Sequence, residues 1–83
     1  MTTIYTFNGK DITMNVVIQI RAVADIIKEK YNLDFIEALS RFYGSETYQT
    51  LRQTENTLWA ESAEYIADRF FEEKEKASAK SLS

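Results

Sequence analysis

The sequence predicts an all-α fold, a small bundle of three to four helices with a short N-terminal β element as an option. Apolar residues recur at the three- and four-residue spacing of a helix face over most of the chain. The 83 residues include no proline and only two glycines, so few positions force a break in a helix. Residues that commonly begin helices stand just before several of these stretches. A chain of this length is expected to form a single domain, residues 1–83.

Residues 1–12 form a leader that differs from the rest of the chain. Residues 3–7 are rich in β-forming side chains, Asn8-Gly9 is a typical hairpin turn, and residues 10–13 supply a return strand. An isolated two-stranded hairpin is only marginally stable in water. Three interpretations therefore stay open: a hairpin, a disordered arm, or an edge strand that pairs with another chain.

The first helix is predicted over residues 13–31. One face of it is apolar at helical spacing and consists of Val16, Ile20, Val23, Ala24, Ile27 and Tyr31. Val17 and Ile18 widen this apolar stripe beyond one face. A helix of this kind is typical of a central position in a fold or of an interface.

The second helix is predicted over residues 35–43. Asp34 is the expected N-cap, and Glu37 stands three residues later as its capping-box partner. The residues expected to face inward are Phe35, Ala38, Leu39 and Phe42. Gly44 follows the helix at the position where a left-handed residue commonly ends it.

A third, shorter helix is predicted over residues 46–53, with Ser45 as its N-cap. Residues 54–61 predict a turn or an irregular link, because polar residues surround two apolar anchors there. The expected buried residues of this region are Tyr48 and Leu51 in the helix and Leu58 and Trp59 in the link.

The last helix is predicted over residues 63–76, with Ser62 as its N-cap. Its core-facing residues are expected to be Ile66, Ala67 and Phe70, with Tyr65 as a further candidate. Residues 77–83 are small and polar, which predicts a frayed tail.

Composition excludes several classes of enzyme. Because the chain has no cysteine and no histidine, it cannot build Cys–His or Ser–His nucleophilic machinery. Gly9 and Gly44 are too far apart to form a glycine-rich phosphate loop. The sequence therefore predicts a protein that is not an enzyme and has no catalytic residue, no metal and no cofactor. The first ten residues lack a signal-peptide pattern, and no apolar run approaches the ~20 residues of a membrane span, so the expected location is the cytoplasm.

Carboxylates at three- and four-residue spacing follow one face of the last predicted helix, at Glu61, Glu64, Asp68, Glu72 and Glu75. The favoured interpretation is a solvated face, because carboxylates on one straight helix do not enclose a site. The alternatives are a hard-cation site, an acid–base pair, or an acidic stripe that docks a basic partner.

The helix–Gly–helix arrangement around Gly44 superficially suggests a helix-turn-helix, and a small DNA-binding transcriptional regulator is the alternative function. Only Arg41 and Arg52 supply positive charge in this region. The net charge is −3, all of it contributed by residues 46–83, and an acidic chain repels phosphate backbones. Nucleic-acid binding is therefore disfavoured.

Aromatic residues are numerous for so small a core, with five tyrosines, five phenylalanines and one tryptophan. Surface tyrosine and tryptophan commonly anchor protein interfaces. The candidate interface residues are Tyr43, Trp59, Tyr65 and Phe71. Chains of this size without disulfides often gain stability from a partner, so we expect either a protein partner or a homodimer.

The segment Leu33 to Glu73 contains LDFIEALSRF, then SETYQTL, then TLWAESAEYI. It resembles a group of short, uncharacterised bacterial helical proteins that look like antitoxin-type partners encoded beside toxin-like genes, some of them ADP-ribosyltransferase-like. The resemblance implies a bacterial source and a protein partner, and it brings no catalytic motif. The expected function is thus a non-enzymatic protein-interaction module of antitoxin-like type.

Overall fold

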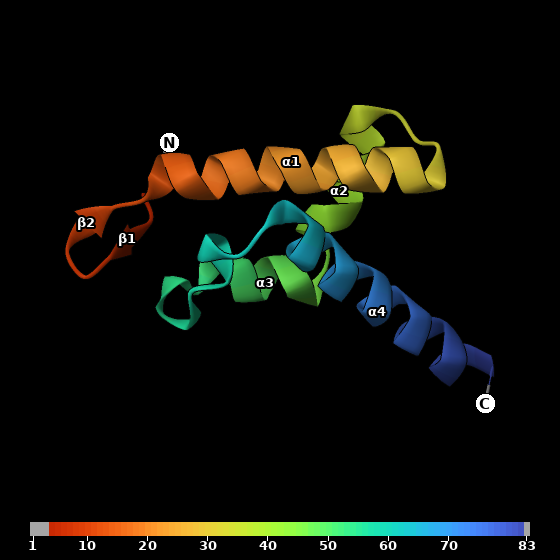
Figure 1. Ribbon diagram of the computed structural model, residues 1–83. Coiled ribbons are helices and arrows are strands. Elements are labelled where there is room, and N and C mark those ends of the chain that lie inside the picture. Colours follow the sequence, from red (N-terminus) through yellow and green to blue (C-terminus); the bar gives the residue numbers. More distant parts are fainter. Residues whose placement is uncertain (1–3, 83) are drawn as a thin grey trace.

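The computed structural model describes residues 4–82 and has the predicted class: four α-helices preceded by a short N-terminal β-hairpin. In chain order the elements are β1 (Thr6–Phe7), β2 (Lys10–Asp11), α1 (Thr13–Tyr31), α2 (Phe35–Tyr43), α3 (Glu46–Arg52), the 3-10 turns η1 (Thr54–Asn56) and η2 (Leu58–Ala60), and α4 (Ala63–Leu82). Figure 1 shows α2 crossing the long helix α1, α3 lying below α1, and α4 leading away to the C-terminus. Within the described residues no helix is both long and apolar enough to cross a membrane.

The leader forms the hairpin, one of the three interpretations that the sequence leaves open. Asn8 and Gly9 both have positive φ angles, 52° and 77°, as the tight turn between two strands requires. The hairpin does not stand alone, because the Phe7 ring packs on Trp59 with their centroids 5.5 Å apart. The Thr54 hydroxyl also donates to the Thr6 carbonyl at 2.6 Å. These contacts to η1 and η2 supply the tertiary support that an isolated hairpin lacks. Residues 1–3 lie outside the described part.

Helix α1 has the predicted bounds. The left-handed residue that ends a helix in this fold is found after α1, and not at Gly44 after α2, where the sequence predicts it. Asn32 adopts the left-handed conformation with φ 53°, and its N–H donates to the Lys28 carbonyl. Gly44, predicted to be the left-handed residue after α2, instead has φ −86°. The chain turns at Gly44 without a positive φ, because the N–H groups of Gly44 and Ser45 donate to carbonyls of the last turn of α2. The prediction for Gly44 is therefore wrong.

The predicted N-caps are present. The Asp34 carboxylate accepts from the Glu37 N–H at 2.8 Å, and the Ser45 hydroxyl accepts from the Tyr48 N–H at 3.0 Å. The Ser62 hydroxyl accepts from an N–H in the first turn of α4 at 3.1 Å. The Glu37 side chain does not complete a capping box, because it pairs with Arg41 at 3.1 Å instead.

Two helix ends differ from the prediction. Helix α3 ends at Arg52, one residue earlier than expected. Helix α4 continues to Leu82, well beyond the predicted end near Lys76, so the backbone of residues 77–82 is helical. Ser83, the last residue of the predicted tail, lies outside the described part.

The core lies where α1, α2, α3 and α4 meet. Its large, fully buried side chains include Phe42, Phe70, Ile27, Leu51, Ile66, Val16 and Val23. The Phe42 ring is at its centre and meets Phe70 and Tyr48 edge to face, at centroid distances of 6.1 and 5.6 Å. Some residues predicted to be buried are only half-buried, namely Phe35, Leu39, Tyr48 and Trp59, and Tyr31 is 38% exposed. Phe35 and Leu39 form part of a surface groove.

Candidate functional site

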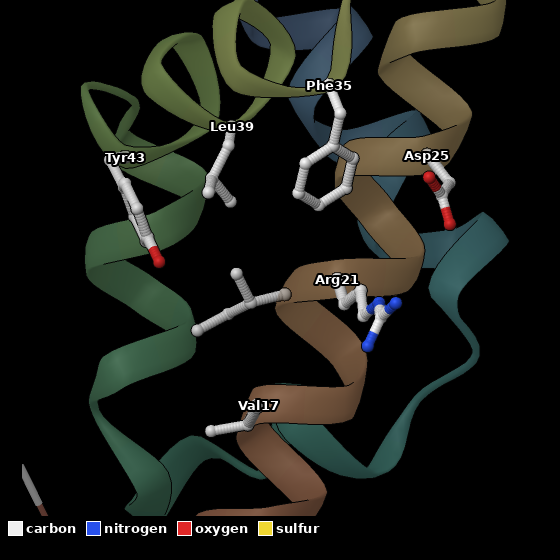
Figure 2. A pocket seen from close by; sticks show the side chains of 7 residues that line it. Val17, Arg21, Asp25, Phe35, Leu39 and Tyr43 are labelled. Carbon is white, nitrogen blue, oxygen red and sulfur yellow. The ribbon is translucent and has the colours of Figure 1, made fainter.

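The described part of the chain contains an apolar groove between α1 and α2, with a volume of about 510 Å³. We call it the α1–α2 groove. Figure 2 shows side chains of α2 projecting toward α1 across it. Its lining residues are Val17, Ile20, Arg21, Asp25, Phe35, Leu39 and Tyr43.

The groove exists because α2 is apolar on two sides. Ala38 and Phe42 face the core and are fully buried. Phe35, Leu39 and Tyr43 follow each other at four-residue spacing, so they share a second face that forms one wall of the groove. On α1, the apolar stripe continues past the core residues to Val17, which is 47% exposed. The wider stripe that the sequence indicates is therefore the opposite wall of the groove.

Exposed apolar side chains continue from the groove onto the outer surfaces of both helices. Met14 and Ile18 on α1 are 67% and 58% exposed, and Ile36 on α2 is 69% exposed. Single exposed apolar residues are ordinary, but a cluster around an apolar hollow is typical of an interaction site. The sequence alone indicates that Val17 and Ile18 extend the apolar stripe of α1 beyond the core. Nothing in the sequence separates Met14 and Ile36 from core residues.

Two opposite charges lie at the edge of the groove. Arg21 and Asp25 stand one turn apart on the exposed side of α1 (Figure 2). Within the described residues, neither forms an ion pair or a side-chain hydrogen bond. Both groups are thus available to charges on another molecule.

The four aromatic residues that the sequence proposes as an interface occupy different surroundings. Tyr43 lines the α1–α2 groove and is 44% exposed. Tyr65 lines a smaller hollow of about 140 Å³ beside α4. Phe71 is half-buried, with its ring 5.7 Å from that of Tyr31. Tyr43 is therefore the candidate that belongs to the groove.

Trp59 is held by contacts within the chain. Its indole N–H donates to the Thr54 carbonyl at 2.9 Å, and its ring packs on Phe7. The Gln19 side-chain amide donates to the carbonyls of Trp59 and Glu61, which ties α1 to η2. Trp59 thus joins the hairpin, the 3-10 turns and α1.

A tyrosine cluster supports the end of the groove at Tyr43. The Tyr43 and Tyr48 rings lie 4.9 Å apart, edge to face. Burial, together with a hydrogen bond to the Tyr5 side chain, raises the pKa of Tyr48 to about 12. The neutral phenol is therefore the form that the folded protein stabilises.

We expect the raised pKa of Tyr48 to make stability fall at alkaline pH. The neutral phenol contributes fully to the free energy of unfolding below the ordinary tyrosine pKa of 10.0. This contribution is lost as the pH rises toward about 12, the pKa of Tyr48 in the folded protein. Denaturant unfolding of the wild type and of Tyr48→Phe, measured from pH 8 upward, checks this. The variant should lose less stability than the wild type across this window. Equal losses in the two proteins would contradict the assignment.

The carboxylates of α4, together with Glu61 just before it, divide into two kinds. Glu61, Glu64, Asp68, Glu72 and Glu75 are all exposed. In the described part of the chain, no group of three or more carboxylates could hold a metal ion. Glu73 differs, because its two oxygens accept from the Glu46 N–H and the Thr47 N–H, each at 2.9 Å, and from the Thr47 hydroxyl at 2.8 Å. This carboxylate joins α4 to the first turn of α3, a role that spacing along the sequence does not reveal.

The same contact bears on the helix-turn-helix comparison. In that motif, the N-terminal end of the second helix faces the nucleic acid. Here the first N–H groups of α3 are already bound by Glu73 and Ser45. Arg41 pairs with Glu37, and Arg52 lies over the Tyr48 ring at 5.8 Å. The first N–H groups of α3 and these two arginines are thus engaged within the protein.

Comparison of the chain with protein families, with curated proteins and with solved structures finds no match in any of the three.

Proposed function

We propose that this chain is a non-enzymatic protein-interaction module that docks a protein chain in the α1–α2 groove. The observation that carries the proposal is the joining of an apolar hollow of about 510 Å³ to a cluster of exposed apolar side chains on the same two helices. Covering these side chains removes apolar surface from water, which is the main driving force of protein association. Arg21 and Asp25 at the edge supply polar groups that fix the orientation of the bound chain.

A finer proposal concerns the kind of partner and the setting. The resemblance of residues 33–73 to antitoxin-type proteins supports a toxin-like partner in a bacterial cytoplasm. The groove lies partly within this segment, because Phe35, Leu39 and Tyr43 all belong to it. The identity of the protein captured through the groove tests this finer proposal.

We expect Val17→Glu to abolish capture of the partner from a native lysate while leaving the fold intact. The substitution places a charge on the groove wall, where a docked chain would have to desolvate it. Val17 is 47% exposed, and glutamate has a better helix propensity than valine, so the helix tolerates the change. Affinity capture with quantitative mass spectrometry, together with circular dichroism of the variant, measures both effects.

Tyr65→Glu is the matched control. Tyr65 is also 47% exposed and receives the same charge, but it lies outside the groove. Retained capture by Tyr65→Glu and lost capture by Val17→Glu would support docking in the groove. The reverse pattern would move the docking surface to α4. Equal capture by both variants and the wild type would contradict the proposal for either surface.

A further inference from the structure

The outer surface of α1 carries a seam of four exposed residues beside the groove. Met14, Ile18, Arg21 and Asp25 follow each other at spacings of four, three and four residues, and all four are exposed. This spacing keeps side chains on one line along a helix and is the spacing by which helices pair. The seam begins with two apolar residues and continues with two opposite charges.

The two charges complement each other under a two-fold rotation. A two-fold interface brings the same patch of both chains together, so residue i contacts residue j while j contacts i. Two copies of α1 that run antiparallel, with the axis between positions 21 and 25, place Arg21 of one protomer opposite the partner's Asp25. The second pair, Asp25 with the partner's Arg21, follows by symmetry. Both charges, which have no ion-pair partner in the described part of the monomer, are then paired.

We propose that the occupant of this surface is a second copy of the chain, in a two-fold dimer with its α1 helices antiparallel and Arg21 paired with the partner's Asp25. The inference goes beyond the proposed function, because it concerns the seam of α1 beside the α1–α2 groove and not the groove itself. The exposed Ile18 and Val17 flank the charge pairs, so the same contact covers apolar surface. Self-complementarity is the argument for a copy rather than a different protein, because the patch supplies both members of each pair.

The register gives Ile18 a defined neighbour. With the axis at the level of position 23, Ile18 of one protomer lies opposite the partner's Lys28. The aliphatic stem of a lysine covers apolar surface while its ammonium group stays in water, so this juxtaposition is compatible with a buried Ile18. In this antiparallel arrangement, no like charges face each other at the axis. In a parallel pair of helices in register, by contrast, Arg21 would face the partner's Arg21 and Asp25 would face the partner's Asp25.

Charge reversal at the two positions tests the dimer. Arg21→Asp places two acidic groups on each chain, and Asp25→Arg places two basic groups. In either homodimer, like charges then face each other at two symmetric points, and the dimer Kd should rise about tenfold or more. When the two variants are mixed, each acidic chain meets a basic chain, and the heterodimer should form with a Kd near that of the wild type. Sedimentation equilibrium of each protein and of the mixture, with one variant carrying a mass tag, measures these constants.

Circular dichroism should show unchanged helicity, because both residues are exposed. A dimeric wild type, weakened single variants and a restored heterodimer would support the proposal. Single variants that dimerise as well as the wild type would overturn it and place the dimer contact elsewhere. A wild type that stays monomeric would also overturn it. If Val17→Glu still loses a captured partner in that case, the protein-interaction function stands and the occupant is a different protein. If Val17→Glu captures the same proteins as the wild type, both proposals fail.

Discussion

Replacing Phe42 with alanine is expected to lower the free energy of unfolding by about 3–5 kcal/mol, the range measured for truncation of buried aromatic side chains. The side chain is fully buried, and its ring contacts both Tyr48 and Phe70. Three helices therefore lose a shared contact, because Phe42 is on α2, Tyr48 on α3 and Phe70 on α4. Small domains have a total stability of about 5–15 kcal/mol, so this loss is a large part of the whole.

Thermal and denaturant unfolding followed by circular dichroism measures the effect of Phe42→Ala. The expected fall in Tm is about 15 °C or more for a domain of this size. Tyr65→Ala is the control, since it truncates an exposed aromatic ring and should change stability by about 0.5 kcal/mol or less. A loss below about 1 kcal/mol for Phe42→Ala would contradict the central position of this ring in the core.

The bounds of α1 and α2 follow from local sequence signals. The apolar period of α1 persists over the whole helix, and Asp34 caps α2 with a side chain suited to that position. Ser45 and Ser62 likewise mark the starts of α3 and α4. These features depend on residues close in sequence, so tertiary packing does not change them.

The end of a helix is harder to predict, because several residues can close it. Gly44 has the preferred residue type for a left-handed position, yet Asn32 is the residue that adopts it. At Gly44 the next cap, Ser45, follows at once, and the short connection fixes the backbone path. The sequence predicts too early an end for α4 for a related reason. The small polar residues after Lys76 do not prevent a helix from continuing.

The groove is only half predictable from the sequence. Val17 and Ile18 signal an interface because they extend an apolar stripe that is already wide enough for the core. Phe35 and Leu39 give no such signal, since the periodicity of α2 places them beside Ala38 and Phe42 on one broad apolar face. Which part of that face is covered depends on the angle at which α2 crosses α1, and that angle is a tertiary property.

Replacing Glu73 with glutamine is expected to lower the free energy of unfolding at neutral pH by about 1–2 kcal/mol, similar to the loss of a helix cap. The carboxylate binds the Glu46 and Thr47 N–H groups at the start of α3, while Ser45 binds the Tyr48 N–H. The negative charge also lies at the positive end of that helix dipole. Glutamine retains one acceptor oxygen and loses the charge. Because the carboxylate is partly exposed, water screens the effect and keeps it within this range.

The pH dependence identifies the charge as the cause. Partial burial acts to raise the pKa of Glu73, but the hydrogen bonds from Glu46 and Thr47 outweigh it and hold the pKa below the ordinary 4.5. The stabilisation is therefore complete above pH 4.5 and is lost as the pH falls through the pKa of the folded protein. The stability difference between wild type and Glu73→Gln should shrink over that acidic range in denaturant titrations. Glu72→Gln, at the exposed neighbouring position, should show little difference at any pH. A difference for Glu73→Gln that stays constant down to strongly acidic pH would mean that the side chain acts through packing and not through its charge.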